Sequence, residues 1–152
     1  MNHVIFVPFQ GQIRAIGTQN LNGCTAVAII SPLGAILAHI PPMPYPSQDP
    51  NIGMQNLIRL MDQLLSLYRT HAYAFPTGGT SLVVGAYHGG SPALPHHLQQ
   101  IRSILLAQGL IPLLRMYNVT LGGHRGPAEG TVFIDARTGE VTVYVEDQPL
   151  GI

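Results

Sequence analysis

The sequence predicts an α/β protein of the α+β sandwich type: a mixed or antiparallel β-sheet core with two main helices packed on it. Three observations predict it. Short apolar segments of strand character occur along the whole chain. Only two segments repeat apolar residues at helical spacing. The 152 residues, 46% of them apolar, suffice for one domain with a core of its own, so we expect a single domain over 1–152.

The first part of the chain is dominated by predicted strands. Apolar runs predict strands over 4–7, 13–17, 24–30 and 34–39. Ser31-Pro32-Leu33 is a turn signal between the last two runs, which makes them a predicted hairpin. The proline-rich segment 41–47 cannot enter a helix or a central strand, so we expect a stiff surface loop. Its proline spacing also resembles that of a polyproline ligand.

The second part alternates helices and strands. Asp49-Pro50 is a helix-start pair, and apolar residues at helical spacing continue to about Thr70. Ser91-Pro92 is a similar pair that would begin a second helix, which ends at Gly109. Further strands are predicted over 81–87, 112–119, 131–135 and 141–145, the last two as a hairpin, with glycine-rich loops at 88–92 and 122–127.

The composition excludes several classes of partner. Only 9% of the residues are charged, against about 25% in ordinary soluble proteins, and the formal net charge is zero. Nothing therefore suggests binding to nucleic acid, and no apolar run is long enough to span a membrane. A single cysteine and a start without a basic and apolar leader indicate a cytoplasmic protein with a free thiol.

That single cysteine, Cys24, has a histidine within reach. If a two-residue loop at Ser31-Pro32 closes the hairpin, Cys24 stands directly opposite His39. A four-residue loop places the two residues diagonally on the same face, whereas a loop of odd length places them on opposite faces. The hairpin pattern alone therefore makes a Cys–His pair plausible.

Such a pair suits nucleophilic catalysis. A thiol has a pKa of about 8.5, so an imidazole that accepts its proton makes the thiolate available. The same imidazole can return the proton to an amine leaving group, and the hydroxyl of Thr18 could fix the ring. The N–H groups of the Asn22-Gly23 turn would be free to bind an oxyanion. From these residues alone, a small buried apolar side chain is the commoner interpretation of Cys24, and a polar strand end is that of His39.

The spacing of these residues resembles a known family. The pattern runs through Thr18, Leu21, Cys24, Ala26 and Val27, then Ser31-Pro32, then Gly34, Ala35, Ala38, His39 and Pro41. It is similar to the N-terminal half of the CheD family, the bacterial chemoreceptor glutamine deamidases. Gly122-Gly123-His124-Arg125 and Thr138-Gly139-Glu140 resemble that family's C-terminal loop and closing hairpin, so the likeness extends along most of the chain.

The resemblance implies a cofactor-free cysteine hydrolase. It assigns Cys24 as the nucleophile, His39 as the general base and Thr18 as the residue that orients the histidine. The implied reaction deamidates glutamine side chains of a protein substrate to glutamate through a thioester. The implied fold is an α/β sandwich whose Cys-His site is similar to that of cytotoxic necrotizing factor toxins. The chain departs from the family in a shorter hairpin turn, in Gly23 where the family has serine, and over 87–92.

Residues around the pair are candidate substrate contacts: Asn22, Gly23, Tyr87, His124 and Arg125. One cysteine and no His-x-x-x-His spacing predict no metal site. Two alternatives stay open. One is a non-catalytic binding module of the same fold, with a patch formed by the loops at 41–46, 88–92 and 122–127. The other is an effector deamidase delivered into a host cell, for which the absence of lysine is a possible sign. The oligomeric state is undetermined.

Overall fold

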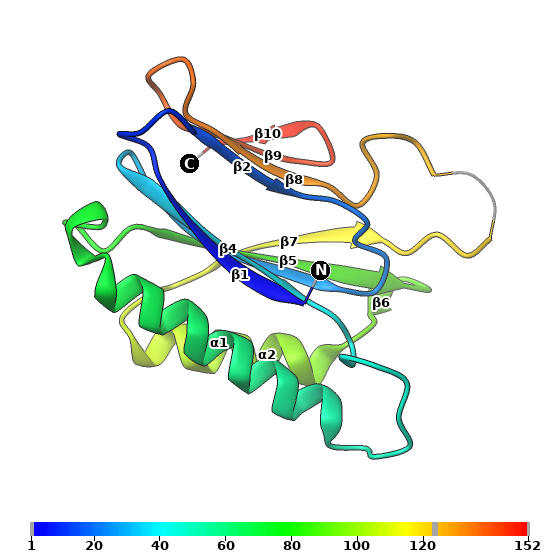
Figure 1. The fold of residues 1–152 in the computed structure, drawn as a ribbon. Helices are drawn as coiled ribbons and strands as arrows, with labels where there is room; N and C mark the ends of the chain where they lie inside the picture. Colours follow the sequence, from blue (N-terminus) through cyan, green and yellow to red (C-terminus); the bar gives the residue numbers. More distant parts are fainter. Residues whose placement is uncertain (1, 123–124, 152) are drawn as a thin grey trace.

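The protein is an α+β sandwich of three layers in a computed structural model that describes residues 2–122 and 125–151 (Figure 1). Two helices, α1 and α2, cover one face of a large sheet, and a smaller sheet covers the other face. The helices are α1 (Ile52–Thr70) and α2 (Pro95–Ala107), with a short 3₁₀ helix at Ala72–Ala74. The strands are β1 (His3–Pro8), β2 (Ala15–Thr18), β3 (Thr25–Ser31), β4 (Gly34–Ile40), β5 (Thr80–His88), β6 (Ser91–Pro92), β7 (Leu113–Asn118), β8 (Val132–Asp135), β9 (Thr142–Val145) and β10 (Gln148–Leu150).

The large sheet is mixed and the small sheet is antiparallel. In the large sheet the order is β1-β4-β3-β5-β6, and β7 lies parallel beside β5. The small sheet has the order β10-β9-β8-β2. Strand β2 lies between β1 and β3 in the sequence but pairs with β8 in the small sheet, which the sequence pattern does not predict. This pairing places Thr18 over the large sheet.

The central strands β3 and β4 are buried on both faces. All seven residues of each strand are buried. In β3, Ala26 and Ala28 face the core between the two sheets, whereas Val27 and Ile29 face the core beneath the helices. This two-sided burial explains why both segments read as continuous apolar runs rather than as alternating patterns. Such strands hold their side chains in a fixed register.

Helix α1 forms on the predicted apolar face, but it begins later than predicted. Leu57, Leu60 and Leu64 recur at helical spacing and are fully buried. The helix starts at Ile52, and Asp49 lies in the preceding turn, where its carboxylate accepts the N–H of Asn51 at 2.9 Å. The aspartate therefore satisfies a turn donor instead of capping the helix directly. In the described part of the chain, no helix combines the length and apolar character needed to cross a membrane.

Two further expectations are corrected by the structure. Ser91-Pro92 does not start α2; it forms the short strand β6, which pairs with Tyr87 and His88 of β5. The helix starts three residues later at Pro95, again with proline in its first turn. Residues 148–150 form β10, which pairs with β9. The sequence shows no clear strand signal there, since the strand is only three residues long.

Candidate functional site

The β3–β4 hairpin places Cys24 and His39 on one face. Its two-residue turn is Pro32-Leu33, because Ser31 pairs with Gly34. His39 therefore stands opposite Ala26, and Cys24, two residues earlier, occupies a diagonal position just before β3. The prediction that the two residues are directly opposed is wrong by this shift. Cys24 nevertheless packs against the core between the two sheets, the side to which the alternation of β4 directs His39.

A hydrogen bond joins His39 to the small sheet. The Oγ1 atom of Thr18, at the end of β2, lies 2.7 Å from Nδ1 of His39. This hydrogen bond restricts the orientation of the imidazole ring. If the ring donates its Nδ1 proton to Oγ1, then Nε2 is the basic nitrogen. The structure thus brings together Thr18 and His39 from two different sheets.

The imidazole of His39 is deeply buried and neutral. Its residue is 1% exposed, and Nε2 has no hydrogen-bond partner among the described residues. Burial lowers the pKa of His39 to about 4, and nearby positive charge, including that of His3, acts in the same direction. His3 stands opposite His39 on β1. At neutral pH the ring is therefore uncharged, with a proton on one nitrogen and a lone pair on the other.

The surroundings of Cys24 disfavour its thiolate form. Cys24 is half-buried, and burial raises the pKa of its thiol, an effect partly offset by a backbone hydrogen bond from Asn22. Since Nε2 of His39 has no partner, thiol and imidazole are not hydrogen-bonded to each other. The thiol and the imidazole are thus a neutral pair on one face of the sheet. Proton transfer between them would require a change in the geometry of the site.

Tyr117 holds the peptide that leads into Cys24. Its hydroxyl donates to the Cys24 carbonyl at 2.6 Å and accepts the Gly23 N–H at 2.8 Å. Tyr117 is 2% exposed, and burial, opposed by the hydrogen bond to Gly23, raises the pKa of the phenol to about 12. The predicted free N–H of Gly23 is therefore wrong, because this donor is already bonded. Sequence reasoning missed Tyr117, and its only signal is a polar aromatic residue near the end of a predicted strand.

The segment after β7 clamps the loop before Cys24. The Asn22 side chain pairs with the backbone of Thr120 through two hydrogen bonds, of 3.1 and 2.9 Å. Arg125 donates to the Leu21 carbonyl at 2.6 Å and lies 3.7 Å from the carboxylate of Glu129. Asn22 and Arg125, expected to touch substrate, thus support the backbone around the thiol.

The remaining predicted contacts are less central. Tyr87 is half-buried near the end of β5, which is separated from β4 and His39 by β3. His124 lies outside the described residues. A cavity of about 400 Å³ opens beside Thr18 and is also lined by Gln19, Phe133 and Asp147. This cavity reaches one member of the Cys–His–Thr set, and Asp147 is an acidic side chain in its lining.

Comparisons with known proteins leave the site to be judged on its geometry. No protein-family model matches the chain, and no curated protein matches it in sequence. Within the described residues no group of three histidine, cysteine or acidic side chains could hold a metal ion. What the geometry provides is an oriented imidazole and a thiol on the same sheet face.

Proposed function

We propose that this chain is a cysteine-dependent amidohydrolase that deamidates glutamine side chains of a protein substrate. The observation that carries the proposal is the 2.7 Å contact between Thr18 and His39. It unites two members of the predicted trio across separate sheets, on the side where Cys24 packs. The likeness of the Thr18, Cys24 and His39 spacing to the CheD deamidases also supports it.

The proposed chemistry uses only side chains of this site and water. Nε2 of His39 accepts the proton of the Cys24 thiol while Sγ attacks the carboxamide carbon of glutamine. The tetrahedral adduct then expels ammonia, which takes the proton from His39, and a thioester remains. His39 next accepts a proton from water as its oxygen attacks the thioester. Release of glutamate returns the proton to the thiol, so one water is consumed for each ammonia formed.

Because the thiol and the imidazole are neutral in the free protein, the proposal gives the substrate a role in proton transfer. A raised pKa of Cys24 and a lowered pKa of His39 both disfavour the thiolate–imidazolium pair in the free protein. Catalytic hydrogen bonds are often long or absent before substrate binds and tighten in the complex. Proton transfer in this proposal accordingly occurs when bound substrate brings Sγ and Nε2 together, and Thr18 keeps the ring oriented meanwhile.

Ammonia release from glutamine-bearing helical peptides tests the proposal. We expect release by the wild-type protein and its loss in Cys24→Ser and His39→Ala, with partial loss in Thr18→Val. Ser103→Ala, a change at an exposed position of α2, is the matched control and should retain full activity. A mass increase on Cys24 that disappears with time would identify the thioester. Equal release by wild type and both site variants would refute the enzyme.

A non-catalytic binding module is the second candidate, and one observation favours it. Tyr117 occupies the Gly23 N–H, and Nε2 of His39 is sealed from solvent. If the site is purely structural, no peptide should yield ammonia or a thioester, although the protein remains folded. In that case Cys24→Ser should bind any partner as the wild type does.

A further inference from the structure

We propose that the open edge of β7, with the adjoining groove under α2, binds an extended acidic segment of a partner protein by strand addition. The inference is independent of whether Cys24 is catalytic. Strand β7 pairs only with β5, so its other edge has no neighbour in the described part of the chain. Unpaired edges of this kind are templates for an added strand.

A side chain covers part of the backbone on this edge of β7. The Leu114 carbonyl accepts a hydrogen bond from the guanidinium of Arg115 at 3.0 Å. A side chain of the same strand thus occupies a position that a neighbouring strand would take. Because backbone groups alternate along a strand, Met116 directs its N–H and carbonyl to the same open side. An incoming strand would displace Arg115 and leave its charge free for a carboxylate.

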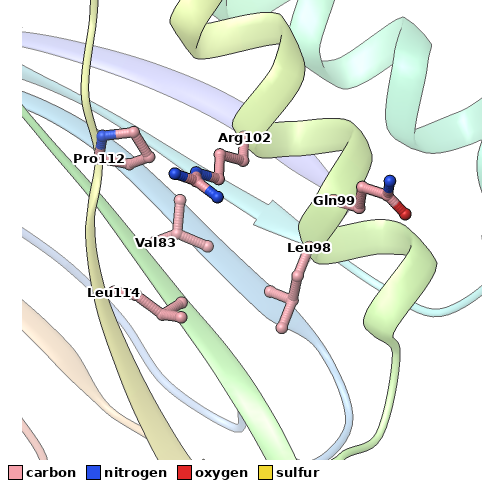
Figure 2. Close-up of a pocket in the computed structure, with 6 residues that line it drawn as sticks. All are labelled: Val83, Leu98, Gln99, Arg102, Pro112 and Leu114. Atoms are coloured by element: carbon pink, nitrogen blue, oxygen red, sulfur yellow. The ribbon is translucent and has the colours of Figure 1, made fainter.

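Beside the edge lies a groove that could hold apolar side chains. A cavity of about 440 Å³ runs between α2 and β7 and is lined by Val83, Leu98, Pro112 and Leu114 (Figure 2). Ile111 and Leu114 are 79% and 52% exposed, so they add apolar surface beside the groove. Apolar surface at an unpaired edge is typical of an interaction site.

The charge at the groove indicates an acidic partner. Arg102 projects from α2 across the cavity toward Pro112 and Val83 (Figure 2). Among the described residues, neither Arg102 nor Arg115 has a carboxylate partner. Leu114 and Arg115 point to opposite faces of the sheet, so an added strand would meet one arginine on each face. A second copy of the chain fits less well, since pairing through β7 would gather the arginines of both copies.

A labelled peptide of about eight residues, in which pairs of valines alternate with pairs of glutamates so that each strand face carries both residue types, serves as the probe. We expect saturable binding by fluorescence anisotropy, weakened by salt and absent for the peptide with lysine in place of glutamate. Arg102→Glu should weaken binding about tenfold. Arg69→Glu, the same change at an exposed position of α1, should not. Slowed hydrogen exchange at Leu114 and Met116 in the complex would locate the peptide on the edge.

Three results would overturn the proposal. The first is that the acidic peptide fails to bind the wild-type protein. The second is that Arg102→Glu binds the peptide as well as Arg69→Glu does. A concentration-dependent dimer in sedimentation, abolished by Leu114→Glu, would assign the edge to self-association instead. None of these outcomes changes the ammonia-release experiment, so the two proposals fail separately.

Discussion

At the scale of single residues, burial and orientation oppose each other around Cys24. Burial raises the pKa of the Cys24 thiol and lowers that of His39, which disfavours the charged pair. The hydroxyl of Thr18 holds the imidazole on the same side as the thiol. In the free protein the thiol and the imidazole thus lie on the same side of the sheet without forming an ion pair.

Tyr117 gives the residue-scale prediction. Tyr117→Phe removes both hydrogen bonds to the peptide before Cys24 and leaves the Gly23 N–H without its partner. We expect the free energy of unfolding to fall by about 1–3 kcal/mol. Because the loop loosens, iodoacetamide should also modify Cys24 faster than in the wild type.

Urea denaturation and alkylation rates measure the two effects. Tyr73→Phe, a change at a residue that is 58% exposed, is the control and should alter neither. An unchanged free energy of unfolding in Tyr117→Phe would mean that the two hydrogen bonds of the Tyr117 hydroxyl do not stabilise the protein.

At the scale of elements, the start of α1 is fixed by a close backbone approach. Gly53, in its first turn, is buried against the proline-rich segment. A Cβ atom added there would lie 2.1 Å from the carbonyl oxygen of Pro42, closer than real contacts allow. The segment at 41–47 is therefore a packed support for the helix as well as a surface connection.

Gly53→Ala separates packing from helix propensity. Alanine in a helix is favoured over glycine by about 1 kcal/mol, so propensity alone predicts stabilisation. We expect the opposite sign, a loss of about 1–3 kcal/mol, because backbone must move to admit the methyl group. Thermal and urea unfolding provide the measurement. Gly11→Ala is the control, since its nearest neighbour, the Pro8 carbonyl oxygen, is 3.9 Å away. A stabilised Gly53→Ala protein would contradict this account of the helix start.

At the scale of the whole molecule, the sheets and the helices bury His39 and His97. Burial lowers the pKa of His39 to about 4, and it also lowers the pKa values of His97 and His3. A depressed pKa means that the unfolded chain binds more protons than the folded protein as the pH falls below about 6.5. Stability should therefore be full at pH 7 and decline toward pH 4.

The pH dependence can be assigned to one residue. For His39 the expected decline is roughly 3 kcal/mol between pH 7 and pH 4. In His39→Gln the slope of unfolding free energy against pH should be shallower by that contribution. The same substitution at His88, at the exposed end of β5, is the control. Identical slopes for wild type and His39→Gln would show that burial of His39 does not make the fold acid-sensitive.

Local signals predicted most elements, because they depend on nearby residues. The apolar runs of β3 and β4 and the helical spacing of Leu57, Leu60 and Leu64 need no knowledge of the rest of the chain. The turn register was harder, since Ser31-Pro32 and Pro32-Leu33 are both acceptable two-residue turns. The structure has the second, with Ser31 paired to Gly34.

The sequence by itself determined the class of fold, the main elements and the candidate pairing of Cys24 with His39 on one hairpin. Only the tertiary structure decided that β2 joins the C-terminal strands, which sets Thr18 against His39. It also decided that Tyr117 takes the Gly23 N–H and that β7 ends the sheet with an open edge. The reason is range: spacing records neighbours along the chain, whereas the Thr18–His39 and Gly23–Tyr117 contacts join residues 21 and 94 positions apart.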